Sequence, residues 1–157
     1  MHMRLTGCLL MHNQWKWDHR YLELAKFIAN WSKDPSTKCG AVITDQHNRI
    51  ISLGFNGFPV GVKDTDKRLN DRDTKYAITI HAERNAILFA KQDLHNCTLY
   101  TWPFQACSEC AAMMIQAGIT RHVAPTYSPV RWKKSFKLAN QLFDEANLTV
   151  NLHNGEI

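Results

Sequence analysis

Apolar runs with the spacing of helices alternate with short apolar runs typical of strands, and this order restricts the possible folds more than any other feature of the chain. Strands are predicted at 39–45, 49–56, 97–102, 119–125 and 148–153. Helices are predicted from Asp18 to about Ser32 and over 81–90, 107–118 and 131–146. One helix, two strands and then three helix–strand pairs predict a single three-layer α/β/α domain over 1–157, built on a five-stranded mixed sheet.

The connections between these elements refine the prediction. Asp18 is a suitable N-cap for the first helix, and the DPST segment at 34–37 ends that helix. The residues 46–48 form a tight connection, so the first two strands are expected to be antiparallel. The polar segment 57–75 is a long loop, and loops of this length are usually functional or disordered.

The composition excludes some classes of protein. No apolar run approaches the ~20 residues of a membrane helix, and the N-terminal run CLLM lacks a secretory cleavage site, so a cytoplasmic location is expected. Five cysteines, two of them in a C-x-x-C, favour metal or redox chemistry over disulfides. The net charge of +5 favours anionic partners. The basic stretch RWKKSFK at 131–137 is either a solvated helix face or a nucleic-acid patch, and nucleic acid is the weaker expectation.

Three metal-binding side chains stand at the starts of two apolar helices. His81, Cys107 and Cys110 are one imidazole and two thiols, a mixture that zinc accepts with a fourth position left open for water. Glu83 lies two residues after His81, which places the two side chains about 200° apart on a regular helix. They can therefore converge only at the helix start, where the carboxylate could move protons for the metal site. Cys8, Cys39 and Cys97 lack ligand spacing and are predicted to be small buried hydrophobes.

Longer segments carry a resemblance to a known family. WSKDPSTKCGAVI (31–43), GFNGFP (54–59), HAERNAI (81–87) and CSECAAMMIQAGI (107–119) resemble the deoxycytidylate (dCMP) deaminases of the cytidine deaminase superfamily. The resemblance implies a cytidine deaminase-like fold, one catalytic Zn²⁺ on His81, Cys107 and Cys110, and Glu83 as the proton shuttle. It also implies a homo-oligomer, expected to be a hexamer.

This resemblance predicts hydrolytic deamination of dCMP to dUMP and ammonia, which supplies thymidylate synthesis. An alternative is a deaminase acting on another cytosine or adenine substrate, including nucleic acid. A zinc-stabilised module without catalysis is a third class, and it would have no need of Glu83. Free-nucleoside cytidine deaminases differ in their first ligand, and tRNA adenosine deaminases lack the SKDPST and GFNGFP segments.

Substrate contacts are predicted at two places. Superfamily members use an asparagine on the sugar, which Asn56 matches, although Asn56 could equally be a turn residue beside Gly57. Ser36, Thr37 and Lys38 form a loop that could bind a 5′-phosphate, or these side chains could only cap and solvate a turn.

Two positions depart from the family pattern. Ala106 stands where family members usually have a proline before the first cysteine, which would pre-set the helix entry. Regulated relatives also bind dCTP or dTTP, with Mg²⁺ as the expected counterion, at a glycine-asparagine-glycine loop matched here by Gly54, Phe55, Asn56 and Gly57. Phe89 could stack on the effector base, but Gln92 replaces an expected phosphate-binding arginine. We therefore expect a weak effector response.

Overall fold

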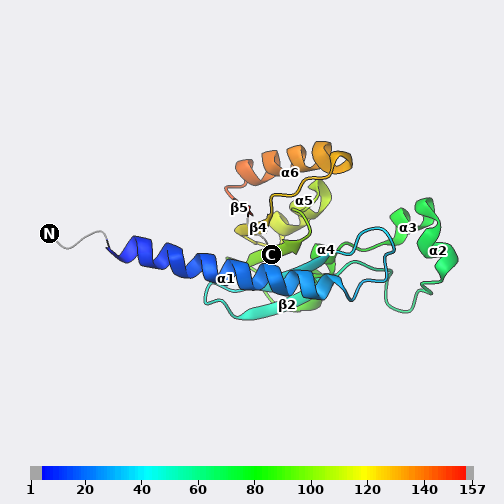
Figure 1. Ribbon diagram of the computed structural model, residues 1–157, viewed down its shortest axis with the longest axis horizontal. Coiled ribbons are helices and arrows are strands. Elements are labelled where there is room, and N and C mark those ends of the chain that lie inside the picture. The colour runs from blue at the N-terminus through cyan, green and yellow to red at the C-terminus, as the bar shows by residue number, and fades with distance from the viewer. Residues whose placement is uncertain (1–4, 155–157) are drawn as a thin grey trace.

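The computed structural model describes the backbone of residues 5–154 and the side chains of residues 13–154 (Figure 1). Its strands are β1 (Gly40–Thr44), β2 (Ile50–Phe55), β3 (Thr98–Trp102), β4 (Arg121–Pro125) and β5 (Thr149–His153). Its helices are α1 (Leu5–Ala29), α2 (Asp66–Asn70), α3 (Arg72–Ile78), α4 (Ala82–Ala90), α5 (Ser108–Gln116) and α6 (Lys133–Glu145), with a 3₁₀ turn, η1 (Val130–Trp132). No helix of this described part is both long and apolar enough to cross a membrane.

The strands form one five-stranded mixed sheet in the order β2-β1-β3-β4-β5. Strand β1 is antiparallel to both of its neighbours, whereas β3, β4 and β5 are parallel. The first two strands are joined by a tight turn in which Asn48 has a φ of 59°, a left-handed conformation that asparagine tolerates. The five predicted strands and the antiparallel pairing of the first two are confirmed.

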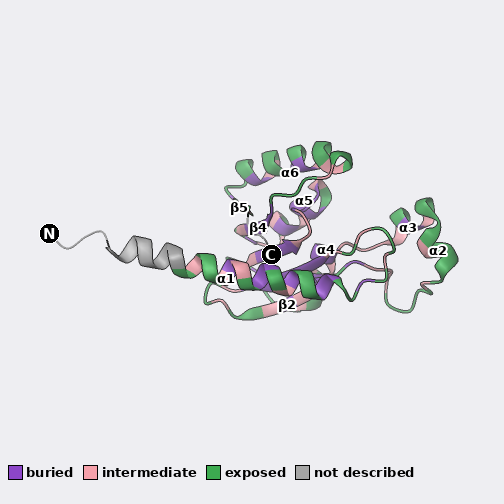
Figure 2. Ribbon diagram, in the orientation of Figure 1, coloured by how far each residue is buried: buried purple, intermediate pink, exposed green. Residues whose placement is uncertain are grey.

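Helices cover both faces of this sheet, so the predicted three-layer α/β/α architecture is confirmed (Figures 1 and 2). On one face, α1 buries an apolar stripe against the side chains of three strands; this cluster consists of Tyr21, Leu22, Ala25, Val42, Tyr100 and Val123. On the other face, α4, α5 and α6 pack over alternate residues of the same strands, including Ile43 and Leu99. Helix α6 buries Phe136, Ala139 and Phe143 and turns its lysines outward, which supports the solvated-face interpretation of 131–137.

Two glycines allow the helices to approach the sheet closely. A Cβ atom at Gly40 would lie 2.0 Å from the carbonyl oxygen of Ala25 in α1. A Cβ atom at Gly54 would lie 2.3 Å from the carbonyl oxygen of Ala82 and 2.5 Å from the backbone nitrogen of Ala86, both in α4. Only glycine leaves room for these contacts. Gly54 therefore fixes the depth at which the start of α4 sits on β2.

Two sequence predictions are wrong. Asp18 does not cap a helix, because α1 begins well before it; the Asp18 carboxylate is buried and accepts hydrogen bonds from Arg121 at 2.8 and 2.5 Å. The segment 57–75 is not a loop throughout, because it contains α2 and most of α3. The oxygen atoms of Thr65 and Asp71 cap these two short helices by accepting backbone N–H bonds.

Candidate metal centre and active site

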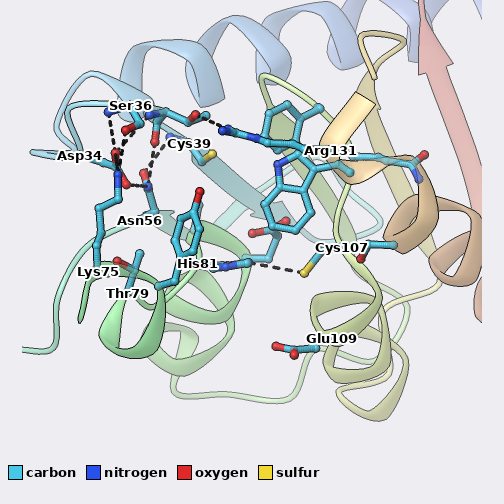
Figure 3. A pocket seen from close by; sticks show the side chains of 18 of the residues that line it. Asp34, Ser36, Cys39, Asn56, Lys75, Thr79, His81, Cys107, Glu109 and Arg131 are labelled. Carbon is cyan, nitrogen blue, oxygen red and sulfur yellow. Dashed lines mark hydrogen bonds and ion pairs between the residues drawn. The ribbon is translucent and has the colours of Figure 1, made fainter. Parts of the chain in front are cut away.

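The starts of α4 and α5 bring the three predicted metal ligands together; Figure 3 shows two of them, His81 and Cys107. His81 is the N-cap residue of α4 and Cys107 is the N-cap residue of α5, with Cys110 in the first turn of that helix. Neither the His81 nor the Cys107 side chain makes the capping hydrogen bond that N-cap residues commonly make to their own helix. Their side chains point instead toward each other, with the His81 Nδ1 atom near both cysteine sulfurs.

The geometry of these donors suits zinc. The Nδ1 atom of His81 lies 3.5 Å from the Cys107 sulfur and 3.4 Å from the Cys110 sulfur, and all three donor atoms lie within 4.8 Å of one another. Zn–N bonds of about 2.0 Å and Zn–S bonds of about 2.3 Å at tetrahedral angles give donor separations of about 3.5 Å between nitrogen and sulfur. The donor set and its spacing therefore fit a tetrahedral Zn²⁺ with one position left for another ligand.

Electrostatics favour the metal-binding form of Cys107. The pKa of Cys107 is lowered to about 4, chiefly by a hydrogen bond from Cys110 and also by the hydrogen bond and charge of His81, while burial of the thiol acts against them. The same bond raises the pKa of Cys110, so the two sulfurs share one proton. The hydrogen bond to Cys107 raises the pKa of His81. Thiolate is the form that binds metals, and Cys107 has this form at neutral pH.

Glu83 is the carboxylate that remains available beside this cluster. Three acidic residues line the surrounding pocket, but Asp34 pairs with Lys75 and the exposed Glu109 pairs with Arg84. Glu83 is 7% exposed and makes no ion pair within the described part of the chain. Burial raises the pKa of Glu83, which brings it closer to the range useful for proton transfer.

The pocket around these groups has a volume of about 420 Å³ and an apolar wall. Phe104 and Trp132 line it, with ring centroids 6.3 Å apart. The Trp132 ring meets His81 edge-on at 6.2 Å. Aromatic faces of this kind suit a flat heterocycle held beside the metal ligands.

Cationic side chains also line the pocket, and sequence reasoning did not assign them to it. Lys75 of α3 is buried, with its Nζ atom 2.8 Å from the Ser36 hydroxyl and 3.1 Å from the Asp34 carboxylate (Figure 3). Arg131 donates a hydrogen bond of 2.7 Å to the hydroxyl of Thr37, and Arg72 also lines the pocket. Arg131 belongs to the basic stretch noted in the sequence, but no motif marks Lys75 or Arg72.

The residues predicted to contact substrate are only partly brought together. Ser36 and Asn56 line the pocket, whereas Lys38 is not among its lining residues. The Asn56 amide donates to the carbonyl oxygen of Thr37 at 2.9 Å and accepts from the backbone N–H of Cys39 at 2.8 Å. Asn56 therefore holds the 34–39 loop in place.

Two of the remaining cysteines have different surroundings. Cys97 is buried as predicted, but Cys39 is only half-buried and lines the pocket, so its description as a buried hydrophobe is wrong. Burial raises the pKa of the Cys39 thiol, and the nearby Glu83 carboxylate raises it further. Cys39 is thus a neutral thiol at the pocket wall. Cys8 lies outside the residues whose side chains are described.

The predicted effector residues lie where α4 packs against β2, or close to that contact. Gly54 lies under α4, and Phe55 is bound through its carbonyl oxygen to the Asn85 amide. Phe89 is 54% exposed, and a Cβ atom at Gly57 would meet nothing within 4 Å. The helix ends at Ala90, so Gln92 lies beyond α4 and not on its face. The structure thus describes how these residues pack and how exposed they are. Their role in binding an effector stays a prediction.

Comparisons with known proteins agree with this arrangement. Residues 15–126 match the family model of the cytidine and deoxycytidylate deaminase zinc-binding region. An uncharacterised deaminase of Aliivibrio fischeri, from the luxG 3′ region, is 44% identical over 138 residues, which cover 86% of this chain and 92% of the relative. The deoxycytidylate deaminase of Pongo abelii is 33% identical over 153 residues, covering 94% and 85%.

A solved structure also shares the fold. The dCMP deaminase of cyanophage S-TIM5, in complex with dCMP and dUMP, superposes with a TM-score of 0.69 over 97% of this chain and all of the phage protein. The sequences are 19% identical, so this match supports the architecture alone.

Proposed function

The chain belongs to the cytidine and deoxycytidylate deaminase zinc-binding family, and we propose from this premise that it converts dCMP to dUMP and ammonia with one catalytic Zn²⁺. One observation carries the proposal: two of the three metal donors, His81 and Cys107, line one pocket together with the buried Glu83, and cationic side chains line the same pocket; these are Lys75, Arg72 and Arg131. Such a pocket matches a cytosine base at one end and a phosphate at the other. Relatives named deoxycytidylate deaminase support the same substrate.

His81, Cys107 and Cys110 would hold the zinc, which when bound supplies a Lewis acid that makes water nucleophilic near neutral pH. Glu83 would take the first proton from the water as it attacks C4 of cytosine and deliver it to N3. It would then take the second proton from the new C4 hydroxyl as the carbonyl forms and pass it to the amine, which leaves as ammonia when the C4–N bond breaks. Burial supports this role because it raises the pKa of Glu83 and excludes competing water from the carboxylate. Phe104 and Trp132 orient the base by contact with its faces.

The cationic side of the pocket would bind the 5′-phosphate. Arg131 and Arg72 offer guanidinium groups suited to phosphate oxygens, and Ser36 and Thr37 offer hydroxyl groups. The Lys75 ammonium is already bound to Asp34 and Ser36, which gives it the role of holding the loop. Lys38, proposed from the sequence, lies outside the pocket lining.

A substrate panel tests this function. Purified zinc-loaded protein is incubated with dCMP, deoxycytidine, CMP, adenosine monophosphate and single-stranded oligonucleotides while ammonia release is followed. Preference for dCMP over deoxycytidine supports the monophosphate assignment. Activity mainly on oligonucleotides would support the nucleic-acid alternative, and zinc binding without ammonia release would support a non-catalytic module.

We further propose that the protein is a cytoplasmic homo-oligomer, with a hexamer as the expected size, feeding thymidylate synthesis. Apolar side chains exposed around α1, β2 and α4 support self-association; they are Phe27, Trp31, Phe55, Leu88 and Phe89. Light scattering measures the size. An effector site using Gly54, Phe55, Gly57 and Phe89 would respond weakly to dCTP or dTTP with Mg²⁺, by less than the 1–3 kcal/mol of typical coupling. Saturation curves with and without these nucleotides test it.

A further inference from the structure

The segment between β3 and α5 delivers Cys107 to the metal centre, and a buried histidine of the neighbouring strand holds it. His122 lies on β4, and neither it nor Ala106 has any exposed surface. The backbone N–H of Ala106 donates a hydrogen bond of 3.1 Å to Nε2 of His122. Ala106 is the residue immediately before Cys107, so this bond fixes the chain one residue from a metal donor.

The other ring nitrogen of His122 is also occupied. Nδ1 lies 2.9 Å from the carbonyl oxygen of Leu99 on β3, the residue that pairs with His122 in the parallel ladder. Because a carbonyl oxygen only accepts, Nδ1 must carry the proton, and Nε2 must accept from Ala106. The two contacts therefore select one neutral tautomer. Burial lowers the pKa of His122 to about 4, which agrees with a ring that stays neutral at physiological pH.

Other contacts hold the neighbouring positions. The backbone N–H of Ser108, on the other side of Cys107, donates to the Ser135 hydroxyl at 2.9 Å. Thr101 donates to the carbonyl oxygen of Phe104 at 2.7 Å, and the Gln105 amide donates to the carbonyl oxygen of Phe136 at 3.3 Å. These two bonds anchor parts of the segment that lie further from Cys107 than Ala106 does. The Ala106 bond also needs a residue with an N–H, which a proline at this position would lack.

We propose that His122 is a positioning residue for the metal centre, acting through the Ala106 backbone to keep Cys107 in ligand geometry. The inference rests on the zinc site of the proposed function. Partners that orient metal ligands typically change metal affinity by about 10–100-fold when removed. His122 touches no donor atom itself, so its effect should fall at the lower end of that range.

Two conservative variants separate the two bonds of His122. His122→Asn keeps an amide N–H near the Nδ1 position, where it can still reach Leu99, but it removes the acceptor for Ala106. His122→Gln can place its side-chain oxygen near the Nε2 position and keep that acceptor. Phe143→Leu is the matched control, because the Phe143 ring packs 5.6 Å from His122 without bonding the segment.

The measurements use the full-length zinc-loaded protein. For His122→Asn, we expect zinc to pass to a chromophoric chelator about tenfold faster than from the wild type, and the Ala106 amide to exchange with deuterium faster. His122→Gln should restore both quantities toward wild type. Phe143→Leu should lower the melting temperature but leave both near wild type. Zinc release and Ala106 exchange no faster in His122→Asn than in Phe143→Leu would overturn the proposal.

Amide exchange in the metal-free wild type provides a test that needs no variant. The Ala106 amide should be strongly protected by His122 without zinc, and exchange at the rate of an unstructured amide would refute the hydrogen bond's role. Wild-type protein that binds no zinc would refute the proposed function, whereas protection of Ala106 in that same protein would leave the contact itself standing.

Discussion

The Lys75 ammonium lies 3.1 Å from the Asp34 carboxylate, although 41 residues separate the two in the chain. Both side chains are almost fully buried. Asp34 also accepts backbone N–H bonds from Ser36 at 2.7 Å and Thr37 at 3.1 Å. The ion pair thus joins α3 to the loop that lines the cationic side of the pocket.

Replacing Lys75 by methionine should disturb both stability and substrate binding. The Asp34 carboxylate would remain buried without its partner, at a cost of roughly 3 kcal/mol in the free energy of unfolding. The loop would also lose its shape, so KM for dCMP should rise more than kcat falls. Chemical denaturation and saturation kinetics measure these effects. The exposed Lys67, replaced in the same way, is the control and should change neither quantity.

If the pocket binds the phosphate of dCMP, substitution of Arg131 should weaken binding, whereas substitution of Lys38 should not. Arg131→Gln should raise KM for dCMP by about tenfold, in line with the loss of one charge-assisted hydrogen bond, and should leave residual deoxycytidine turnover almost unchanged. Lys38→Gln should change KM little because Lys38 does not line the pocket. A larger effect of Lys38→Gln than of Arg131→Gln would reverse the structural assignment in favour of the sequence-based one.

Glu83→Gln should separate metal binding from turnover. The substitution keeps the shape of the side chain and removes its ability to carry a proton, so kcat should fall by at least about 100-fold. Zinc content by elemental analysis should stay unchanged, because Glu83 is not among the three donors. The free energy of unfolding should be equal or higher, since a buried carboxylate without an ion pair disappears. Turnover within a few-fold of wild type would contradict the role of Glu83.

The Asp18–Arg121 pair should give the protein an acid-sensitive component of stability. Burial raises the pKa of Asp18, but hydrogen bonds from Arg121, Gln14 and Tyr100, together with the Arg121 charge, lower it overall below 3.8. The unfolded chain therefore takes up a proton first as the pH falls. The contribution is complete above pH 3.8 and is lost as the pH falls from there toward the folded-state pKa.

Asp18→Asn should remove this component and flatten the dependence of unfolding free energy on pH below 3.8. At neutral pH it should cost roughly 3 kcal/mol, because Arg121 loses its buried partner. Denaturant titrations at a series of pH values measure both effects. An unchanged slope in the variant would show that Asp18 does not control acid stability.

The sequence predicted those helices and strands in which buried apolar residues recur at regular spacing. Strand β1 could be recognised because every one of its residues is buried, and α4 and α5 because apolar residues follow a polar start. The position of Asp18 could not be recognised in this way, since an aspartate before an apolar run is also a cap signal. Its partner Arg121 lies 103 residues away, and only the folded chain brings the two together.

The short helices α2 and α3 did leave a signal, because Thr65 and Asp71 are both typical N-cap residues. Their lengths of 5 and 7 residues are too short for an apolar period to appear. The candidate site shows the same division. Metal donors are recognisable by side-chain type and spacing, whereas Lys75 and Arg72 lie in α3, which carries no motif, and reach the pocket through tertiary packing.

His81 and Cys107 occupy helix starts without capping them, and their positions along the chain give this arrangement a topological consequence. They lie 26 residues apart, with α4 and β3 between them. A metal bound to both closes that stretch into a ring, and a ring has fewer unfolded conformations than an open chain. The metal centre would then also reduce the number of conformations open to the unfolded chain. Losing the ion would loosen the starts of α4 and α5 and the central strand β3 together.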